Sequence, residues 1–370
     1  MLHSPLELTN WQKIQVSLLY HYASFGYLKG LQRLVHQLMQ DIDPALDLAK
    51  LQNRDALITN TRWGMRDSSK NWADNGWPIL ADFELAIATQ LAKRAYESYT
   101  ATGSNQYERG LAELSLNWMT PDEQEGFERK FSEISHYAMK VDDTLSQHEQ
   151  AGRWDDFGLA IQYRESSFDF SQAPKLRLRP DVVGITGKTP PRTGVYLPVD
   201  NLHGTPQFCW TGTPAGVLLE ANSFNDLGLE ALTAVGRRDL WVDDERMYEF
   251  AQDHRNDPRL MQDPLFDDSI DDVDLTSSLV ARNSFTSRAC EWIFVEQVHG
   301  ELEEWEDEST SSAENGVRVI AGAPCPKEGF YFTPASPSSR RYFMQGEMLP
   351  NTSGDYGLTI WQMDEDQRPE

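Results

Sequence analysis

The sequence predicts an α+β fold in which an N-terminal helical bundle is followed by a mixed α/β region with antiparallel strands. In the first third of the chain, apolar residues recur at helical spacing behind helix-capping residues. Further on, proline and glycine become frequent and short runs of β-forming residues appear. Helices and strands do not alternate, which argues against a parallel βαβ sheet. We therefore expect a helical bundle at residues 1–160 and a mixed α+β region at residues 161–370.

Capping residues mark the first and third helices of the bundle. Thr9 and Gln12 have the spacing of a capping box, and so do Thr120 and Glu123, with Pro121 at the first helical position. An apolar stripe at helical spacing follows each box. The stripes are Ile14, Leu18, Phe25, Leu28, Val35 and Leu38 in the first helix, and Phe127, Phe131, Ile134, Ala138, Val141 and Leu145 in the third.

The second helix is expected to follow Pro78 and to end at Gly103, and its apolar residues recur at every fourth position. They are Phe83, Ile87, Leu91, Ala95 and Tyr99. In the first helix, Gly26 and Gly30 either bend the helix or admit a close neighbour. Three long amphipathic helices of this kind can pack as an antiparallel bundle.

The mixed region contains short strand candidates, two short helices and an acidic loop. The expected strands are Val195–Val199, Gln207–Trp210, Val217–Ala221, Trp292–Val298, Val317–Ala321, Phe330–Thr333 and Leu358–Trp361. Helices are expected at Asp226–Val235 and Asp243–Gln252. The sequence DPLFDDSIDDVD, Asp263–Asp274, is expected to be a loop because six of its residues are acidic.

Carboxylates dominate the charge of the chain, and one segment holds most of the excess. The net charge is −25, of which −17 falls between residues 239 and 314, where 22 Asp and Glu accompany five Arg and no Lys. This distribution argues against nucleic acid as a partner, because phosphates are bound by Lys and Arg. It favours either a cationic partner or a role in solubility.

Several features predict a cytoplasmic location. No apolar run reaches the length of a transmembrane helix, and the N-terminal residues lack the pattern of a secretory signal. The three cysteines, Cys209, Cys290 and Cys325, are far apart and form no CxxC pair, as expected of free thiols in a reducing compartment.

Motifs for catalysis, cofactors and metals are incomplete. GITGKTPP, Gly184–Pro191, lacks the first glycine of a phosphate loop, and its two prolines disfavour the helix that such a loop opens, so we expect a surface loop. His148 and Glu149 begin an HExxH-like string, but Gly152 takes the place of the second histidine. DDSIDDVD, Asp267–Asp274, lacks the glycine and spacing of a calcium loop. We therefore predict no catalytic residue, no cofactor and no metal site, and a protein that is not an enzyme.

Two stretches resemble a known class of proteins. The first is TGVYLPVDNLHGTPQFCWTG, Thr193–Gly212, together with SFNDLGLEALTAVGRRDLWVDDERMYEF, Ser223–Phe250. The second comprises GAPCPKEGFYFTPA, SRRYFMQGEMLP and DYGLTIWQ, between Gly322 and Gln362. Together they resemble the predicted immunity proteins of bacterial polymorphic toxin systems, in immunity families 71 and 72. The helical first third is similar to these families only in general character.

The resemblance implies a protein encoded beside a toxin, often one delivered by a type VI secretion system or an Rhs-like carrier. Such a protein binds the toxin and blocks it in the producing cell and its kin, and the resemblance transfers no catalytic residue. Aromatic residues of the C-terminal strings are expected to form core between turns rather than contact the toxin. These residues are Phe330, Phe332, Tyr342, Phe343 and Trp361.

The acidic segment has a role in this interpretation, because toxins that act on nucleic acids tend to carry a basic groove. An acidic inhibitor can occupy that groove and accelerate the encounter by electrostatic steering. The candidate toxin-binding residues are Glu301, Glu303, Glu304, Glu306, Asp307, Glu308, Asp267, Asp268, Asp271 and Asp272.

A solvated Ser-rich loop at residues 301–315 is the alternative for the segment. For the whole protein, the alternatives are a hydrolase with a carboxylate pair in a Trp-rich cleft and a structural adaptor. The oligomeric state is not predicted.

Overall fold

A computed structural model of the protein confirms the α+β class, since helices come first and antiparallel sheets with further helices follow. The structure describes residues 7–58, 64–147, 153–199, 201–303, 305, 318–321, 324–325, 327–333, 336–350 and 360–363. By its internal contacts the chain divides into two compact units, Met1–Glu303 and Glu304–Glu370. The first unit contains the predicted bundle and most of the predicted mixed region.

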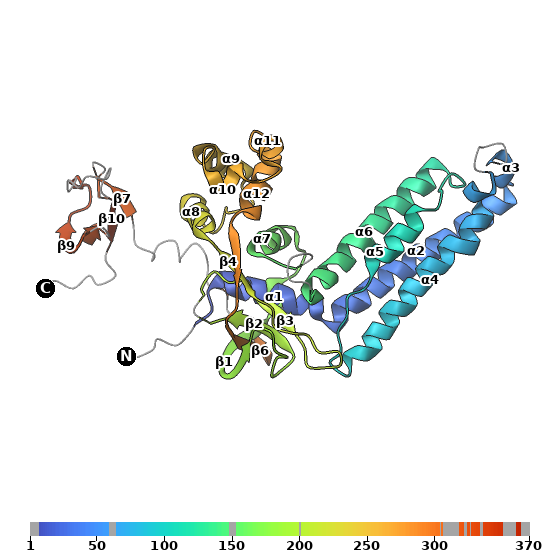
Figure 1. Ribbon diagram of the computed structural model, residues 1–370, viewed down its shortest axis with the longest axis horizontal. Helices are drawn as coiled ribbons and strands as arrows, with labels where there is room; N and C mark the ends of the chain where they lie inside the picture. Colours follow the sequence, from blue (N-terminus) through green and yellow to red (C-terminus); the bar gives the residue numbers. More distant parts are fainter. Residues whose placement is uncertain are drawn as a thin grey trace. The chain divides into compact units, whose positions relative to one another are not determined.

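Helices α2, α4, α5 and α6 pack alongside one another in the first unit (Figure 1). The helices up to the first strand are α1 Asn10–Ala23, α2 Phe25–Leu51, α3 Asp55–Ile58, α4 Ser69–Arg94, α5 Ser104–Ala112, α6 Pro121–Leu145 and α7 Asp156–Glu165, with 3₁₀ turns at Gly64–Asp67 and Phe170–Gln172. The apolar stripes predicted for α2 and α6 meet in one core, in which Leu28, Val35 and Ala138 are fully buried. Burial of these stripes, rather than helix propensity alone, holds the bundle together.

Both predicted capping boxes are present. The hydroxyl of Thr9 accepts a hydrogen bond from the backbone of Gln12, whose side chain accepts one from the backbone of Thr9. Thr120 and Glu123 make the same reciprocal pair, and Pro121 is the first residue of α6. Each box satisfies two backbone donors that a helix N-terminus otherwise leaves without a partner.

The first predicted helix is in fact two helices, because Ser24 interrupts it. Its backbone is extended, and its hydroxyl accepts a hydrogen bond from the amide of Tyr27, so that Ser24 caps α2. The interruption moves Phe25 out of the apolar stripe, and its side chain is 53% exposed. Of the two predicted roles for Gly30, close approach is the one observed. A Cβ atom at Gly30 would overlap the hydroxyl of Tyr137 from α6.

The second predicted helix has different ends from those expected. Helix α4 begins at Ser69, where Ser68 caps it, and includes Pro78 within its length. It ends at Arg94 rather than at Gly103. Glu97 adopts a left-handed backbone with φ of 53°, which a continuing right-handed helix excludes.

The main sheet of the first unit is antiparallel, with strand order β1-β6-β2-β3. Its strands are β1 Pro174–Ile185, β2 Gly194–Pro198, β3 Gln207–Cys209 and β6 Glu291–Leu302, and a separate pair joins β4 Ala221–Phe224 to β5 Phe285–Arg288. Strands β2, β3 and β6 match predicted strands, whereas β4 begins where the predicted strand Val217–Ala221 ends. GITGKTPP spans the end of β1 and the turn before β2, and it opens no helix, as predicted.

Five helices follow β4 and gather in one cluster (Figure 1). They are α8 Asp226–Val235, α9 Asp244–Asp253, α10 Pro258–Met261, α11 Phe266–Ser269 and α12 Val273–Arg282. The bounds of α8 are those predicted, and α9 begins and ends one residue later than predicted. The prediction of a loop at Asp263–Asp274 is wrong for α11 and for the first residues of α12. Asp272 caps α12 by accepting hydrogen bonds from the amides of Asp274 and Leu275, so an acidic residue starts a helix here.

A buried carboxylate joins this cluster to the N-terminal helices. Asp156, the first residue of α7, is 3% exposed and accepts hydrogen bonds from Trp11 and Gln15 of α1. It also accepts one from the indole of Trp241, and it forms an ion pair with Arg237. The guanidinium of Arg237 lies over the ring of Trp11, 4.5 Å from its centroid. Four donors from two distant parts of the chain therefore compensate for the burial of one charge.

The second unit contains an antiparallel sheet with strand order β7-β10-β8-β9. Its strands are β7 Arg318–Ile320, β8 Gly329–Thr333, β9 Ser336–Phe343 and β10 Ile360–Met363. Phe343 and Trp361 are buried with Tyr331, as predicted for core residues, but Tyr342 is 49% exposed because it points to the opposite side of β9 from Phe343. The predicted core residues Phe330 and Phe332 are partly exposed for the same reason.

Candidate interaction surface

The ten candidate toxin-binding residues lie in two places, and part of the set is outside the described residues. Glu301 and Glu303 are at the end of β6, and Asp267, Asp268, Asp271 and Asp272 are in or beside α11 and α12. The remaining four, Glu304, Glu306, Asp307 and Glu308, lie outside the described residues. The structure therefore gives contacts for six of the ten positions.

Glu303 is committed to contacts within the first unit. Its side chain is 5% exposed and forms an ion pair with Lys13 of α1, with 2.9 Å between Nζ and Oε1. Its other carboxylate oxygen accepts a hydrogen bond of 2.6 Å from the amide of Leu176 in β1. Glu301 is different, because it is half exposed and pairs with Lys175 across the β1–β6 ladder. A partner can reach Glu301, but it can reach Glu303 only by displacing these contacts.

The four aspartates near α12 are all exposed. Asp271 binds Arg255 through both carboxylate oxygens, and these hydrogen bonds hold its pKa below the ordinary value. No described lysine, arginine or histidine forms an ion pair with Asp267, Asp268 or Asp272, nor with the neighbouring Asp274. Most of the local negative charge is thus free to act on a partner.

Large apolar side chains accompany these aspartates. Leu265 is 50% exposed, Val273 is 41% exposed and Leu275 is 44% exposed. We call the exposed residues between positions 265 and 275 the acidic face, and they are Leu265, Asp267, Asp268, Asp271, Asp272, Val273, Asp274 and Leu275. Its apolar side chains can be buried against a partner while its carboxylates select a basic one.

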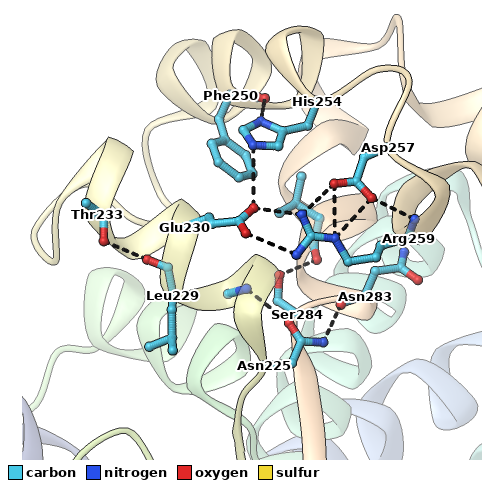
Figure 2. Close-up of polar contacts among 12 residues, drawn as sticks. Asn225, Leu229, Glu230, Thr233, Phe250, His254, Asp257, Arg259, Asn283 and Ser284 are labelled. Carbon is cyan, nitrogen blue, oxygen red and sulfur yellow. Dashed lines mark hydrogen bonds and ion pairs between the residues drawn. The ribbon is translucent and has the colours of Figure 1, made fainter. Parts of the chain in front are cut away.

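An ion-pair network links α8, α9 and α10 within the same helix cluster (Figure 2). Arg259 of α10 binds Glu230 of α8 through two hydrogen bonds of 2.7 and 3.2 Å, and it binds Asp257 through Nε at 3.0 Å. These hydrogen bonds lower the pKa of Asp257. His254, the residue that follows α9, stacks on Phe250, and its Nε2 lies 3.6 Å from Glu230. The guanidinium of Arg259 therefore links α10 to α8, with two parallel hydrogen bonds that suit arginine better than lysine, and His254 links α9 to the same Glu230 carboxylate.

The polar network of Figure 2 also reaches the end of α12. The side chain of Asn225, which caps α8, donates a hydrogen bond to the carbonyl of Asn283, the residue that follows α12. Asn283 in turn donates to Asp263, whose carboxylate also binds Arg282. Asp263 is therefore a structural residue, with a side chain only 6% exposed, and is not part of the acidic face.

The hydrolase alternative requires a carboxylate pair in a cleft. Burial, together with the nearby charge of Asp142, raises the pKa of Asp143 to about 6. Asp143 lines a pocket with Arg153 and Trp154, but the volume of this pocket is only about 10 Å³. That is room for about one water molecule, so the pocket cannot hold a sugar or a peptide substrate.

The described part of the chain contains neither a cluster of metal ligands nor a membrane-spanning helix. No group of three or more His, Cys, Asp or Glu residues there is arranged to hold a metal ion. His148, Glu149 and Gly152, the HExxH-like string, lie outside the described residues. None of the described helices is both long and apolar enough to cross a bilayer.

Comparison of the chain with protein families, curated proteins and solved structures finds no match. The resemblance to immunity families 71 and 72 accordingly stays a prediction. The sequence places the apolar residues of the acidic face within an acidic run, but it does not indicate that they are exposed. A leucine beside aspartates can equally lie on the buried side of a short helix.

Proposed function

We propose that the chain is an immunity protein, which binds a cognate toxin domain stoichiometrically and thereby neutralises it. The observation that carries this proposal is the acidic face, in which four exposed aspartates without an ion pair to any described residue neighbour the exposed Leu265, Val273 and Leu275 in the chain. Aspartates without ion pairs retain their field toward solvent, and exposed leucines lose water favourably only when a partner covers them.

The partner that fits this face has a basic surface with apolar residues at its centre. A toxin that acts on nucleic acid has a basic surface, because its substrate groove must neutralise phosphates. Occupation of that groove by the acidic face would exclude the nucleic acid directly. The net charge of −25 adds long-range attraction, which raises the association rate more than it raises the affinity.

The test is co-expression of this protein with the C-terminal domain encoded by the adjacent upstream gene. We expect the two chains to elute together as a stable complex on size exclusion, and we expect this protein to restore growth to cells that express the toxin domain. An adaptor would form a complex without restoring growth. Absence of a complex, with a neighbour that is harmless when expressed alone, would refute the proposal.

A further inference from the structure

A groove lies between α2 and α6 of the helical bundle, away from the residues of the acidic face. Its volume is about 260 Å³, and its floor is apolar. Leu38 and Ile42 of α2, Phe127 of α6 and Met119 form this floor, and each of them is at least nine-tenths buried. For comparison, an apolar cavity of about 150 Å³ is large enough to hold a benzene molecule. The groove therefore has room for an aromatic or a branched aliphatic side chain.

The groove exists because small residues occupy the facing positions Ala45 on α2 and Gly126 on α6. A Cβ atom added at Gly126 would meet no atom within 4 Å. Gly30 is the opposite case, since there the missing side chain makes room for Tyr137 of the facing helix. Glycine inside a helix costs about 1 kcal/mol relative to alanine. At Gly30 helix packing compensates for this cost, whereas at Gly126 no contact within the described chain does.

Ion pairs hold both walls of the groove in place. Lys130 of α6 pairs with Asp41 of α2. Arg54, which follows α2, binds both carboxylate oxygens of Glu123, near the start of α6. These two pairs link the helices across the groove and oppose its collapse. The rim carries a further cation, Arg129, which is exposed and forms no ion pair with any described acidic residue.

We propose that this groove binds a bulky apolar side chain of a partner polypeptide whose neighbouring carboxylate pairs with Arg129. The apolar floor accounts for the side chain, and the unpaired guanidinium at the rim accounts for the carboxylate. Asp41 and Glu123 do not oppose the carboxylate strongly, because each is already neutralised by its own cation. The proposal does not depend on toxin binding, since the groove and the acidic face share no residue.

N-Acetyltryptophan is a suitable probe, because it carries an indole and a carboxylate in one small molecule. N-Acetyltryptophanamide keeps the indole and removes the charge, and N-acetylglycine keeps the charge and removes the indole. Methyl NMR of the full chain reports on the groove through Ile42 and Met119 of its floor. We expect N-acetyltryptophan to shift both methyl signals and to bind about fivefold more tightly than the amide. We expect N-acetylglycine to have no effect.

Variants separate the two parts of the site. Gly126→Met is expected to fill the groove and abolish the shifts, whereas Gly126→Ala leaves most of the space open and should retain them. Arg129→Gln should remove the preference for the acid over the amide, and Arg109→Gln, an exposed arginine of α5 outside the groove, should not. Circular dichroism of each variant checks that the fold is kept.

Three results would overturn the proposal. One is the absence of shifts in the wild-type protein at saturating probe. Another is persistence of the shifts in Gly126→Met, which would place the probe elsewhere. The third is a wild-type dimer that Gly126→Met converts to a monomer, which would show that a second copy of this chain covers the groove. In addition to these three, equal affinity for acid and amide would overturn the part of the proposal that assigns the carboxylate to Arg129. Co-purification with the toxin domain is unaffected by any of these results, so the two proposals fail separately.

Discussion

The indole nitrogen of Trp241 lies 2.9 Å from the carboxylate of Asp156, although 85 positions separate the two residues in the chain. Trp11 donates to the other oxygen of the same carboxylate at 2.7 Å. The only polar atom of each indole side chain therefore donates to one buried charge. This arrangement joins α1, α7 and the segment between α8 and α9, and it sets the position of the helix cluster that carries the acidic face.

Replacement of Asp156 by alanine should destabilise the first unit by about 3–5 kcal/mol, because it leaves Arg237 and two indoles without their acceptor. Urea unfolding followed by tryptophan fluorescence measures the change. Asp268→Ala removes the same charge from an exposed position without an ion pair and should change the stability by less than about 0.5 kcal/mol. Similar losses for the two variants would contradict the role assigned to Asp156.

Alanine should have opposite effects at two glycines of the bundle. Gly30→Ala places a methyl group against the hydroxyl of Tyr137, which cannot easily retreat because its ring stacks on Tyr27 with 4.0 Å between centroids. We expect a loss of about 1–3 kcal/mol in the free energy of unfolding. Gly126→Ala meets no atom within 4 Å and should gain up to about 1 kcal/mol. Thermal unfolding of both variants gives the two signs, and a gain at Gly30 would show that Tyr137 is free to move.

The bundle should lose stability on mild acidification through His21. Burial, with a smaller contribution from the charge of Lys140, lowers the pKa of His21 from 6.5 to about 4. The folded state therefore binds this proton less readily than the unfolded state, so the stability is fully present above pH 6.5 and is lost as the pH falls toward 4.

The variant His21→Phe keeps a ring beside Tyr27 and Phe168 but cannot titrate. Its free energy of unfolding should fall less than that of the wild type across this pH range. His136→Gln, at an exposed position, serves as the control. Parallel pH profiles for His21→Phe and the wild type would show that His21 does not contribute.

The acidic face should control the rate of toxin association. Neutralisation of Asp267, Asp268 and Asp274 to asparagine should slow association about tenfold at low ionic strength and flatten its dependence on salt. Stopped-flow or biosensor kinetics across a salt series provide the measurement. The triple variant Glu113→Gln, Asp122→Asn and Glu125→Gln removes the same number of charges from exposed positions of the bundle and should leave the rate nearly unchanged. Equal slowing by both variants would attribute the effect to net charge and not to this face.

Local signals in the sequence were sufficient for several elements, because the residues that determine them are neighbours in the chain. The capping boxes at Thr9 and Thr120 and the bounds of α8 depend on contacts three or four residues apart. Strand β1 was missed because Pro180 and three basic residues hide its alternation, and these residues suit an edge strand of the sheet. Helix α11 was missed because its aspartates resemble those of a loop.

The features on which the proposals depend could not be predicted from sequence spacing. Asp156 is surrounded by donors from α1 and from beyond α8, so no local pattern indicates its role. The groove is open because Gly126 has no side chain. A glycine in the middle of a helix is equally consistent with close packing, as at Gly30. The pairing of Glu303 with Lys13 joins residues 290 positions apart, whereas its neighbours in the acidic run suggested an exposed charge.

That pairing has a practical consequence for dividing the chain. Glu303 is the last residue of the first compact unit, and its carboxylate holds both Lys13 and the amide of Leu176. A truncation after Glu303 keeps this ion pair and this hydrogen bond, which connect the end of β6 to α1 and to β1. A truncation after Leu302, one residue shorter, removes both and leaves the ammonium of Lys13 without its carboxylate. A protein that ends at Glu303 should therefore keep the end of β6 in place, whereas the end of β6 should fray in a protein that ends at Leu302.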